Sequence, residues 1–458
     1  MGFTKLIENF FRRFLPSPFT IAVVLTVFTI GLAVVFGQAP EGKNQLFHIL
    51  QMWEKGVWNT GLLVFAYQMM LILVLGHVLV LSKPMERLIL KLTGLVKDSA
   101  SAAVLVAFST TLIAFFNWGL GLIFGALLAR KVGEYAQSKN IPINYPLIGA
   151  CGYVGLMVWH GGISGSAPLK VSEAGHLTQL MSTFQQQAVL AGLPSSISTS
   201  ETVFSVSNIL IFLSVLVSIS LLVRYLGKKA KPTAIDLAIY QFEGETKKKH
   251  SGAEQLDHSK YVSMAFGILI LGAFLVQYLP FLRKLNLTPN LLNFFMLGLA
   301  IILHGNFSNF LKAVEEAIGD VSGILIQFPF YFGIMGIMGG SGMIHQISDF
   351  FVSISTETTL PIFTFLSAGL VNIFVPSGGG QWAVQGPLVL ESALTLGVPL
   401  PKAIMALAYG DQLTNMLQPF WALPLLGITK LKAKEILPYT LLFMVVGGVI
   451  YLLGLLLF

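Results

Sequence analysis

Charged side chains are scarce in this sequence. Only 11% of its 458 residues are Asp, Glu, Lys or Arg, whereas 55% are hydrophobic; in a soluble globular protein about 25% of residues are charged. The mean hydropathy is +0.77. This composition argues against a soluble enzyme, a disordered chain and a nucleic-acid-binding protein. The net charge of +7 comes from basic residues in the loops between apolar runs, where such residues determine membrane topology.

Cysteine and the nucleotide-binding motifs are also scarce or missing. Cys151 is the only cysteine, so no disulfide can form within the chain. There is no Walker A motif, and residues 119–124 lack the last glycine of a dinucleotide-binding fingerprint. Residues 162–166 lack the final glycine of a nucleophile elbow. We therefore expect no enzyme, no cofactor and no ATP-driven process.

The sequence has instead many long stretches without any charged residue. A membrane-spanning helix needs about 20 apolar residues, whereas a membrane β-barrel shows alternating segments of about ten residues, which we do not find. The sequence therefore predicts an all-α polytopic (multi-pass) membrane protein. The uncharged stretches are 14–40, 56–82, 99–129, 141–169, 202–223, 261–282, 285–311, 321–348, 358–390, 412–429 and 436–458.

Loop charges favour a re-entrant hairpin over a single span at residues 101–130. The loops on both sides of it, 82–99 and 130–140, carry more basic than acidic residues. Both loops can be cytoplasmic only if the segment between them enters and leaves the membrane on the same side. The motif Asn117-Trp118-Gly119-Leu120-Gly121 would break this hairpin at its tip, and a similar glycine-rich break at 376–381 predicts a second hairpin at 360–397.

Weak matches between the two halves indicate an internal repeat. Residues 61–64 match 323–326, and the offset shrinks in later matches, as a true repeat with small deletions would give. We count about nine spans plus two re-entrant hairpins. The predicted organisation is a first transmembrane repeat at 1–226, a cytosolic linker at 227–260, and a linking span with a second, inverted repeat at 261–458. The N-terminus is then inside and the C-terminus outside, although Arg283 and Lys284 would lie outside, against the positive-inside rule.

Two polar segments with helix-breaking residues are the candidate sites. They are 159–168 in the first half and 411–421 in the second, and we expect each to interrupt a transmembrane helix. Inverted repeats with two broken transmembrane helices are typical of secondary transporters, because half-helix N-termini favour an anion and freed carbonyls favour a cation. The alternative is a kink whose serine hydroxyls bond to the preceding turn.

Asp411 is the only acid between residues 404 and 429, so it is an ion-coupling candidate. The alternative is a residue near a helix end that is hydrated or paired with Lys402. His160 is a weaker candidate, since a single histidine often only bonds to a neighbouring helix.

At these motifs the sequence resembles the bacterial short-chain fatty acid transporter family (AtoE type), within the wider ion-transporter superfamily. The resemblance covers essentially the whole chain. It implies uptake of short monocarboxylates, such as acetoacetate or butyrate, by a homodimer in the bacterial inner membrane. The motifs that carry it are Pro16-x-Pro18, Asn117-Trp118-Gly119-x-Gly121-Leu122, Gly162-x-Ser164-Gly165-Ser166-x-Pro168-Leu169, Ile326-Gln327-Phe328-Pro329-Phe330-Tyr331, Val375-Pro376-Ser377-Gly378-Gly379-Gly380, Gln385-Gly386-Pro387 and Gln418-Pro419-Phe420-Trp421-Ala422-Leu423-Pro424.

These considerations give two sets of expected site residues. We expect the substrate carboxylate between Ser166 and Ser377, balanced by backbone dipoles and hydroxyls because the sequence offers no membrane-embedded Lys or Arg. The substrate-binding set is Asn117, Ser164, Ser166, Ser377, Gly378, Gly379, Gly380, Gln381, Trp382, Gln418 and Trp421. The ion-coupling set, for H⁺ or Na⁺, is Asn117, Gly161, Asn372, Asp411, Gln412 and Asn415. The alternative function is an intramembrane enzyme that acts on acyl or lipid substrates.

Overall fold

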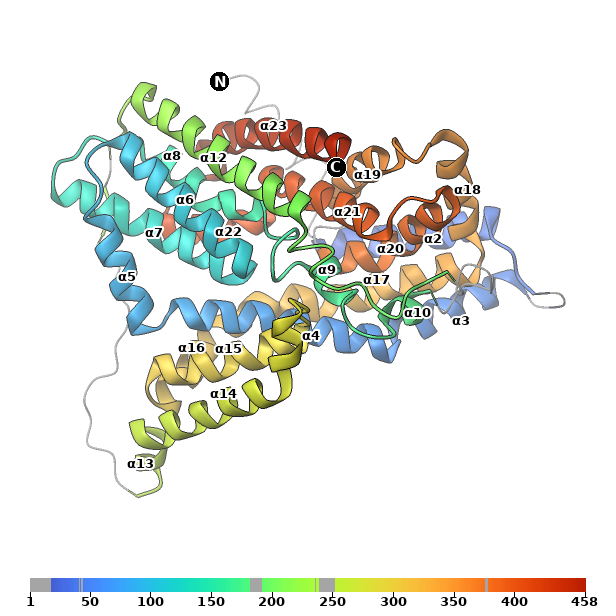
Figure 1. Cartoon of the computed structure of the whole chain (residues 1–458), viewed down its shortest axis with the longest axis horizontal. Helices are drawn as coiled ribbons and strands as arrows, with labels where there is room; N and C mark the ends of the chain where they lie inside the picture. The colour runs from blue at the N-terminus through green and yellow to red at the C-terminus, as the bar shows by residue number, and fades with distance from the viewer. Residues whose placement is uncertain are drawn as a thin grey trace.

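The secondary structure of the described chain is entirely helical (Figure 1). The computed structural model describes residues 18–40, 42, 44–181, 192–234, 236–238, 252–374 and 378–458. Within these residues six helices are long and apolar enough to cross a bilayer: Thr60–Val80, Ser99–Phe116, Val206–Lys229, Lys260–Arg283, Ser322–Gly340 and Ala433–Leu457. The structure therefore agrees with an all-α multi-pass membrane protein, and the count of nine spans stays a prediction.

The first half of the chain ends with a long helix that follows a broken one. Its elements are α2 (Pro18–Phe36), α3 (Gln45–Val57), α4 (Thr60–Val80), α5 (Lys83–Thr93), α6 (Ser99–Phe116), α7 (Trp118–Ser138), α8 (Tyr145–Tyr153) with the 3₁₀ turn η1 (Val154–Met157), α9 (Ser166–Lys170), α10 (His176–Leu180) and α12 (Val206–Lys229).

The second half follows the same order after two connecting helices, α13 (Glu254–Asp257) and α14 (Lys260–Arg283). Its elements are α15 (Pro289–His304), α16 (Phe307–Ala317) with η2 (Ile318–Val321), α17 (Ser322–Gly340), α18 (Met343–Ile354), α19 (Leu360–Phe374), α20 (Gly378–Leu396), α21 (Leu400–Thr414) with η3 (Asn415–Leu417), α22 (Pro419–Thr429) and α23 (Ala433–Leu457).

The contacts between helices also correspond between the two halves. Helix α4 packs on α15, and its counterpart α17 packs on α2; α3 packs on α17, and α16 packs on α4. In the centre, α22 packs on α7 and α9 packs on α20. These reciprocal contacts are what a pseudo-two-fold relation between two halves produces. The sequence match between 61–64 and 323–326 falls in α4 and α17, which are corresponding elements of the two halves.

Helices α6 and α7 form a helical hairpin with its tip at Asn117. This residue is extended (φ −148°, ψ 123°), and its side chain accepts a hydrogen bond from Leu120 N, which caps α7. Just after the tip the two helices nearly touch, because a Cβ on Gly121 would lie 2.5 Å from Ala114 Cα. At the end away from the tip, the backbone amide of Asn144, which precedes α8, donates to Ser99 Oγ at the start of α6 at 3.1 Å. Whether this hairpin is re-entrant stays a prediction.

Helices α19 and α20 occupy the corresponding place in the second half. Gln381 in the first turn of α20 donates to the carbonyl of Ala368 in α19 at 2.9 Å, which joins the two helices near their connection. The connection itself, with the predicted site residue Ser377, lies outside the described residues. The tip of the first hairpin, at Asn117, is fully buried, and the broken helices α8–α9 and α21–α22 pack around the two hairpins.

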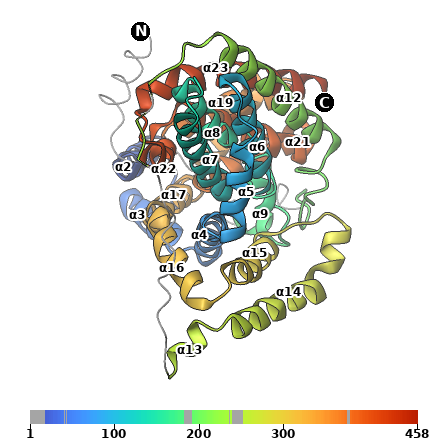
Figure 2. The same cartoon turned by 90° about the vertical axis from the view of Figure 1, so that its left-hand side faces the viewer.

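The centre and the edge of the molecule differ sharply in burial. In the most apolar part of α4, 72% of residues are buried within the protein, against 22% in α14. Helix α14 lies at one edge of the molecule in both views (Figure 2), and it exposes large apolar side chains such as Val276. A bilayer accepts such a surface, so α14 is placed to face lipid.

Candidate functional site

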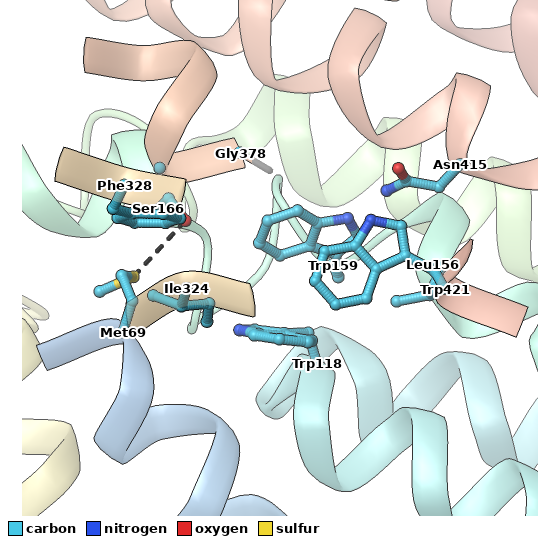
Figure 3. Close-up of a pocket in the computed structure, with 11 residues that line it drawn as sticks. Met69, Trp118, Leu156, Trp159, Ser166, Ile324, Phe328, Gly378, Asn415 and Trp421 are labelled. Atoms are coloured by element: carbon cyan, nitrogen blue, oxygen red, sulfur yellow. Dashed lines mark hydrogen bonds between the residues drawn. The ribbon is translucent and has the colours of Figure 1, made fainter. Parts of the chain in front are cut away.

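A narrow cavity lies where the two broken helices and the two hairpins meet (Figure 3). Residues 158–165 interrupt the first broken helix, and residues 415–418 interrupt the second. The break in the second half is shorter than the predicted segment 411–421. Helix α21 continues through Asp411 to Thr414, and the short turn η3 follows it directly before Pro419. The cavity is lined by Met69, Trp118, Leu156, Trp159, Ser166, Ile324, Phe328, Gly378, Gly379, Asn415 and Trp421.

Three tryptophans form one wall of this cavity (Figure 3). The rings of Trp118 and Trp159 are 5.6 Å apart, and those of Trp118 and Trp421 are 5.4 Å apart and nearly perpendicular. Trp118 and Trp159 are both buried, and neither indole Nε1 finds a hydrogen-bond partner among the described residues. Buried indole N–H groups normally have a partner. The wall therefore offers two hydrogen-bond donors beside an apolar surface.

Two glycines let the second hairpin approach the opposite side of the cavity closely. A Cβ on Gly378 would lie 2.6 Å from the Trp159 ring and 2.8 Å from the His160 ring, and a Cβ on Gly379 would lie 2.8 Å from Phe328. Since α20 begins at Gly378, its first amides have no acceptor within the helix. Ser166 completes this side, with its hydroxyl 3.5 Å from Met69 Sδ.

His160 and Asp411 form a fully buried pair directly behind the cavity. His160 Nδ1 and Asp411 Oδ2 are 2.5 Å apart, and both side chains are 0% exposed. The amide of Ala167 donates to His160 Nε2 at 3.0 Å. A backbone N–H can only donate, so the network assigns the ring proton to Nδ1, which donates to the Asp411 carboxylate. The second carboxylate oxygen, Oδ1, has no partner in the described chain.

This pair identifies partners that the sequence left open. Asp411 is paired with His160 and not with Lys402, and the bond of His160 to a neighbouring helix is the alternative that the sequence offered for it. The bond links two residues 251 positions apart and joins the two halves. The neighbouring contact has the same span, since Gly161 N donates to Gln412 Oε1 at 2.8 Å. The two broken helices are thus tied to each other next to the cavity.

Asn372 organises a second polar cluster behind the second break. Its Nδ2 donates to the Asp411 carbonyl at 2.7 Å and to Asn415 Oδ1 at 3.0 Å. Its own carbonyl accepts from Gln418 Nε2 at 2.5 Å. Four buried oxygens of this region have no donor in the described chain: Asn372 Oδ1, Gln381 Oε1, Asp411 Oδ1 and Gln418 Oε1. Oxygen atoms without donors are the ligands that hard cations prefer. Within the described residues no three His, Cys, Asp or Glu gather as a metal site.

The structure brings only some of the predicted substrate residues to the cavity. Ser166, Gly378, Gly379, Trp421 and the predicted ion-coupling residue Asn415 line it. The others have different contacts. Asn117 caps α7, and its Nδ2 faces the Ile72 carbonyl and Met296 Sδ. Ser164 accepts from Trp118 N, Trp382 donates to His176, Gly380 packs on Tyr331, and Gln381 and Gln418 bond to α19.

Sequence reasoning missed two of the cavity tryptophans and a buried cation. Trp118 stands inside the predicted motif at the tip of the first hairpin, and Trp159 stands inside the first predicted helix break, so the same signals could have found them. The structure adds buried cations that the sequence analysis did not consider: Lys170 in α9 is 4% exposed, and Arg130 and Lys131 are also buried. That no Lys or Arg is embedded in the membrane stays a prediction. Lys170 was overlooked because it follows an uncharged stretch and looks like a loop residue in sequence.

Comparisons with known proteins agree with this architecture. The family model described as "Short chain fatty acid transporter" matches residues 2–458. A putative short-chain fatty acid transporter of Escherichia coli (strain K12) is 35% identical, with 99% of both chains covered. One of Haemophilus influenzae is 33% identical, with 99% of this chain and 98% of the relative covered.

Solved structures show the same fold at low sequence identity. The YdaH transporter of Alcanivorax borkumensis has a TM-score of 0.58 at 16% identity, covering 96% of this chain and 98% of its own. MtrF of Neisseria gonorrhoeae, described with a class of antimetabolite efflux pumps, has a TM-score of 0.60 at 14% identity, covering 98% and 97%. The family and its named relatives are transporters and not enzymes, so the intramembrane enzyme considered from the sequence is set aside. The chain belongs to the short-chain fatty acid transporter family.

Proposed function

We propose that this protein is a secondary transporter that carries short monocarboxylates, such as butyrate and acetoacetate, through the tryptophan-lined cavity. The observation that carries the proposal is the pair of buried, unpartnered indole N–H groups of Trp118 and Trp159 beside an apolar wall. A short fatty acid has matching chemistry, because its carboxylate accepts hydrogen bonds and its alkyl chain prefers an apolar surface. The family membership supports the same substrate class.

The cavity as it stands is too narrow for such a substrate and must open. It has room for roughly one water molecule. The hydrogen bonds His160–Asp411 and Gly161–Gln412 tie the two broken helices together at this point. We propose that the two halves form an inverted repeat with two re-entrant hairpins, and that they rock against each other to expose the cavity to each side in turn. We propose that the protein works as a homodimer in the bacterial inner membrane, as its resemblance to the family implies.

The proposed transport is cation symport. A fully buried carboxylate such as Asp411 is costly without a proton or a cation beside it. Asp411 Oδ1 and the donor-free oxygens of Asn372 and Gln418 would receive that ion. The oxygen ligands suit Na⁺, and the carboxylate suits H⁺, so the coupling ion is to be decided by transport with separately clamped proton and sodium gradients.

Uptake of labelled butyrate into proteoliposomes tests the proposed function. Trp118→Phe and Trp159→Phe keep an aromatic ring but remove the N–H group. One hydrogen bond to a charged group contributes roughly 1.5–3 kcal/mol, so each variant should raise the KM for butyrate by about tenfold or more. Trp58→Phe is the matched control, because Trp58 is 64% exposed. Unchanged KM in both cavity variants would exclude the indole donors, and no uptake by the wild-type protein would exclude the function.

A further inference from the structure

Lys170 is a buried cation one helical turn beyond the cavity. It lies four residues after Ser166 on the short helix α9, so both side chains share a face. Ser166 faces Met69 of α4, and Lys170 Nζ donates to Oε1 of the adjacent Gln68 at 2.9 Å. Lys170 also forms an ion pair with Glu173, and its ammonium lies 5.6 Å from the centre of the Phe65 ring.

The ring of Phe65 separates this ammonium from the cavity. Phe65 is 0% exposed and lies 6.3 Å from the ring of Phe328, which lines the cavity. On the same side, a Cβ on the cavity residue Gly379 would lie 3.0 Å from Phe65 Cζ. One aromatic side chain thus stands between a buried positive charge and the space that takes the proposed substrate.

The contacts of Glu173 allow its carboxylate to move away from Lys170 without becoming a buried, unpaired charge. Its side chain is 20% exposed, compared with 5% for Lys170, so it is the more hydrated partner. Gln68 bridges the pair: its Oε1 accepts from Lys170, and its Nε2 donates to Glu173 Oε1 at 2.9 Å. A second carboxylate that took the place of Glu173 would find the ammonium already oriented by Gln68, while Glu173 turned toward water.

We propose that Lys170 binds the carboxylate of the transported acid, and that Glu173 occupies the same position when no substrate is bound. The inference rests on the proposed function and adds the charged group that recognises an anion. The substrate carboxylate first accepts hydrogen bonds from the two cavity indoles. Movement of the Phe65 ring then lets it reach Lys170 as a second position, while its alkyl chain stays against the tryptophan wall. Charge-assisted hydrogen bonds between an ammonium and a carboxylate are about twice as strong as neutral ones, which makes Lys170 the residue that distinguishes an acid from its uncharged amide.

Three variants separate this role from a purely structural ion pair. Lys170→Gln should raise the KM for butyrate by about tenfold to a hundredfold, with no change in competition by butyramide. Glu173→Gln removes the competing carboxylate and should lower the KM several-fold. The double variant should behave like Lys170→Gln, because the binding group is missing in both.

The opposite pattern would overturn the proposal. If the pair only holds α9 against α4, both single variants lose transport and thermal stability alike, and the double variant, which buries no unpaired charge, recovers them.

Lys170→Arg keeps the charge and should retain discrimination between acid and amide, which keeps the test informative if Lys170→Gln does not fold. Lys131→Gln, in a buried pair with Glu134 on α7, is the matched control. Equal KM in all variants rejects the role of Lys170, whereas absent uptake by the wild-type protein rejects the proposed function itself.

Discussion

Asp411 places a buried carboxylate where the two broken helices meet, and one substitution tests its part in coupling. Asp411→Asn keeps the shape and can still accept from His160 Nδ1–H through its amide oxygen. It removes the negative charge and the oxygen Oδ1 that has no partner among the described residues. A proton-coupled carrier should then lose concentrative uptake yet keep exchange of butyrate across the membrane. A sodium-coupled carrier should keep accumulation at a raised sodium requirement.

The measurement is uptake and counterflow of labelled butyrate in proteoliposomes under clamped ion gradients. Asp257→Asn is the matched control, because Asp257 is exposed in the short helix α13 of the connection. Wild-type accumulation in Asp411→Asn with the same ion dependence would leave Asp411 with a structural role only.

At the residue scale the sequence predicted single side chains better than their partners. Asp411 stands out as a lone acid in an uncharged stretch, so it could be found from sequence. His160 could not be assigned to it, because the two residues are 251 positions apart and the bond depends on how two helix breaks pack. The role of Asn117 in ligand binding stays a prediction, because its oxygen caps α7 and its amide nitrogen faces α4 and α15 in this structure.

The first hairpin depends on a glycine at a close contact between its two helices. A methyl group on Gly121 of α7 would lie 2.5 Å from Ala114 of α6, near the tip of the first hairpin. Gly121→Ala should therefore destabilise the protein by about 1–3 kcal/mol, since overpacking forces backbone shifts. Thermal unfolding in detergent measures this change.

Gly272→Ala on α14 is the matched control for the hairpin prediction. Nothing lies within 4 Å of a Cβ at this position, so replacing a helical glycine should be neutral or stabilise by about 0.5–1 kcal/mol. Equal melting temperatures for the two variants would contradict the close crossing at the hairpin tip.

At the scale of secondary-structure elements, the positions of the helix breaks were easier to predict than their lengths. Glycine and proline clusters marked both hairpin tips and both broken helices. The second broken helix nevertheless stays helical through Gln412 and Thr414, because its polar side chains are satisfied by Gly161 and Asn372 rather than by the backbone of a loop. Only the packing against the first half reveals those partners.

At the scale of the whole molecule, the reciprocal packing of the two halves is the main reason to expect alternating access. Helix α4 contacts α15 as α17 contacts α2, and the broken helices cross each other's hairpins in the same reciprocal way. The sequence showed this relation only as scattered matches, because apolar residues can replace one another at most positions of a bundle. The order of helices supports the predicted repeat more than residue identity does.

The first hairpin gives the sharpest test of the arrangement in the membrane. Residue 95 precedes α6 and residue 135 lies in the last turns of α7, so both lie at the end of the hairpin away from its tip at Asn117. If the hairpin is re-entrant, single cysteines at Leu95 and Tyr135 must react with a membrane-impermeant thiol reagent from the same, cytoplasmic side. The background variant is Cys151→Ala, which removes the one native thiol, itself buried. A cysteine at Trp58, before α4, should react from the opposite side, because the 21 residues of α4 are enough to cross the bilayer. Labelling of positions 95 and 135 from opposite sides would make α6 and α7 two parts of one span, and the inverted relation between the halves would then fail with it.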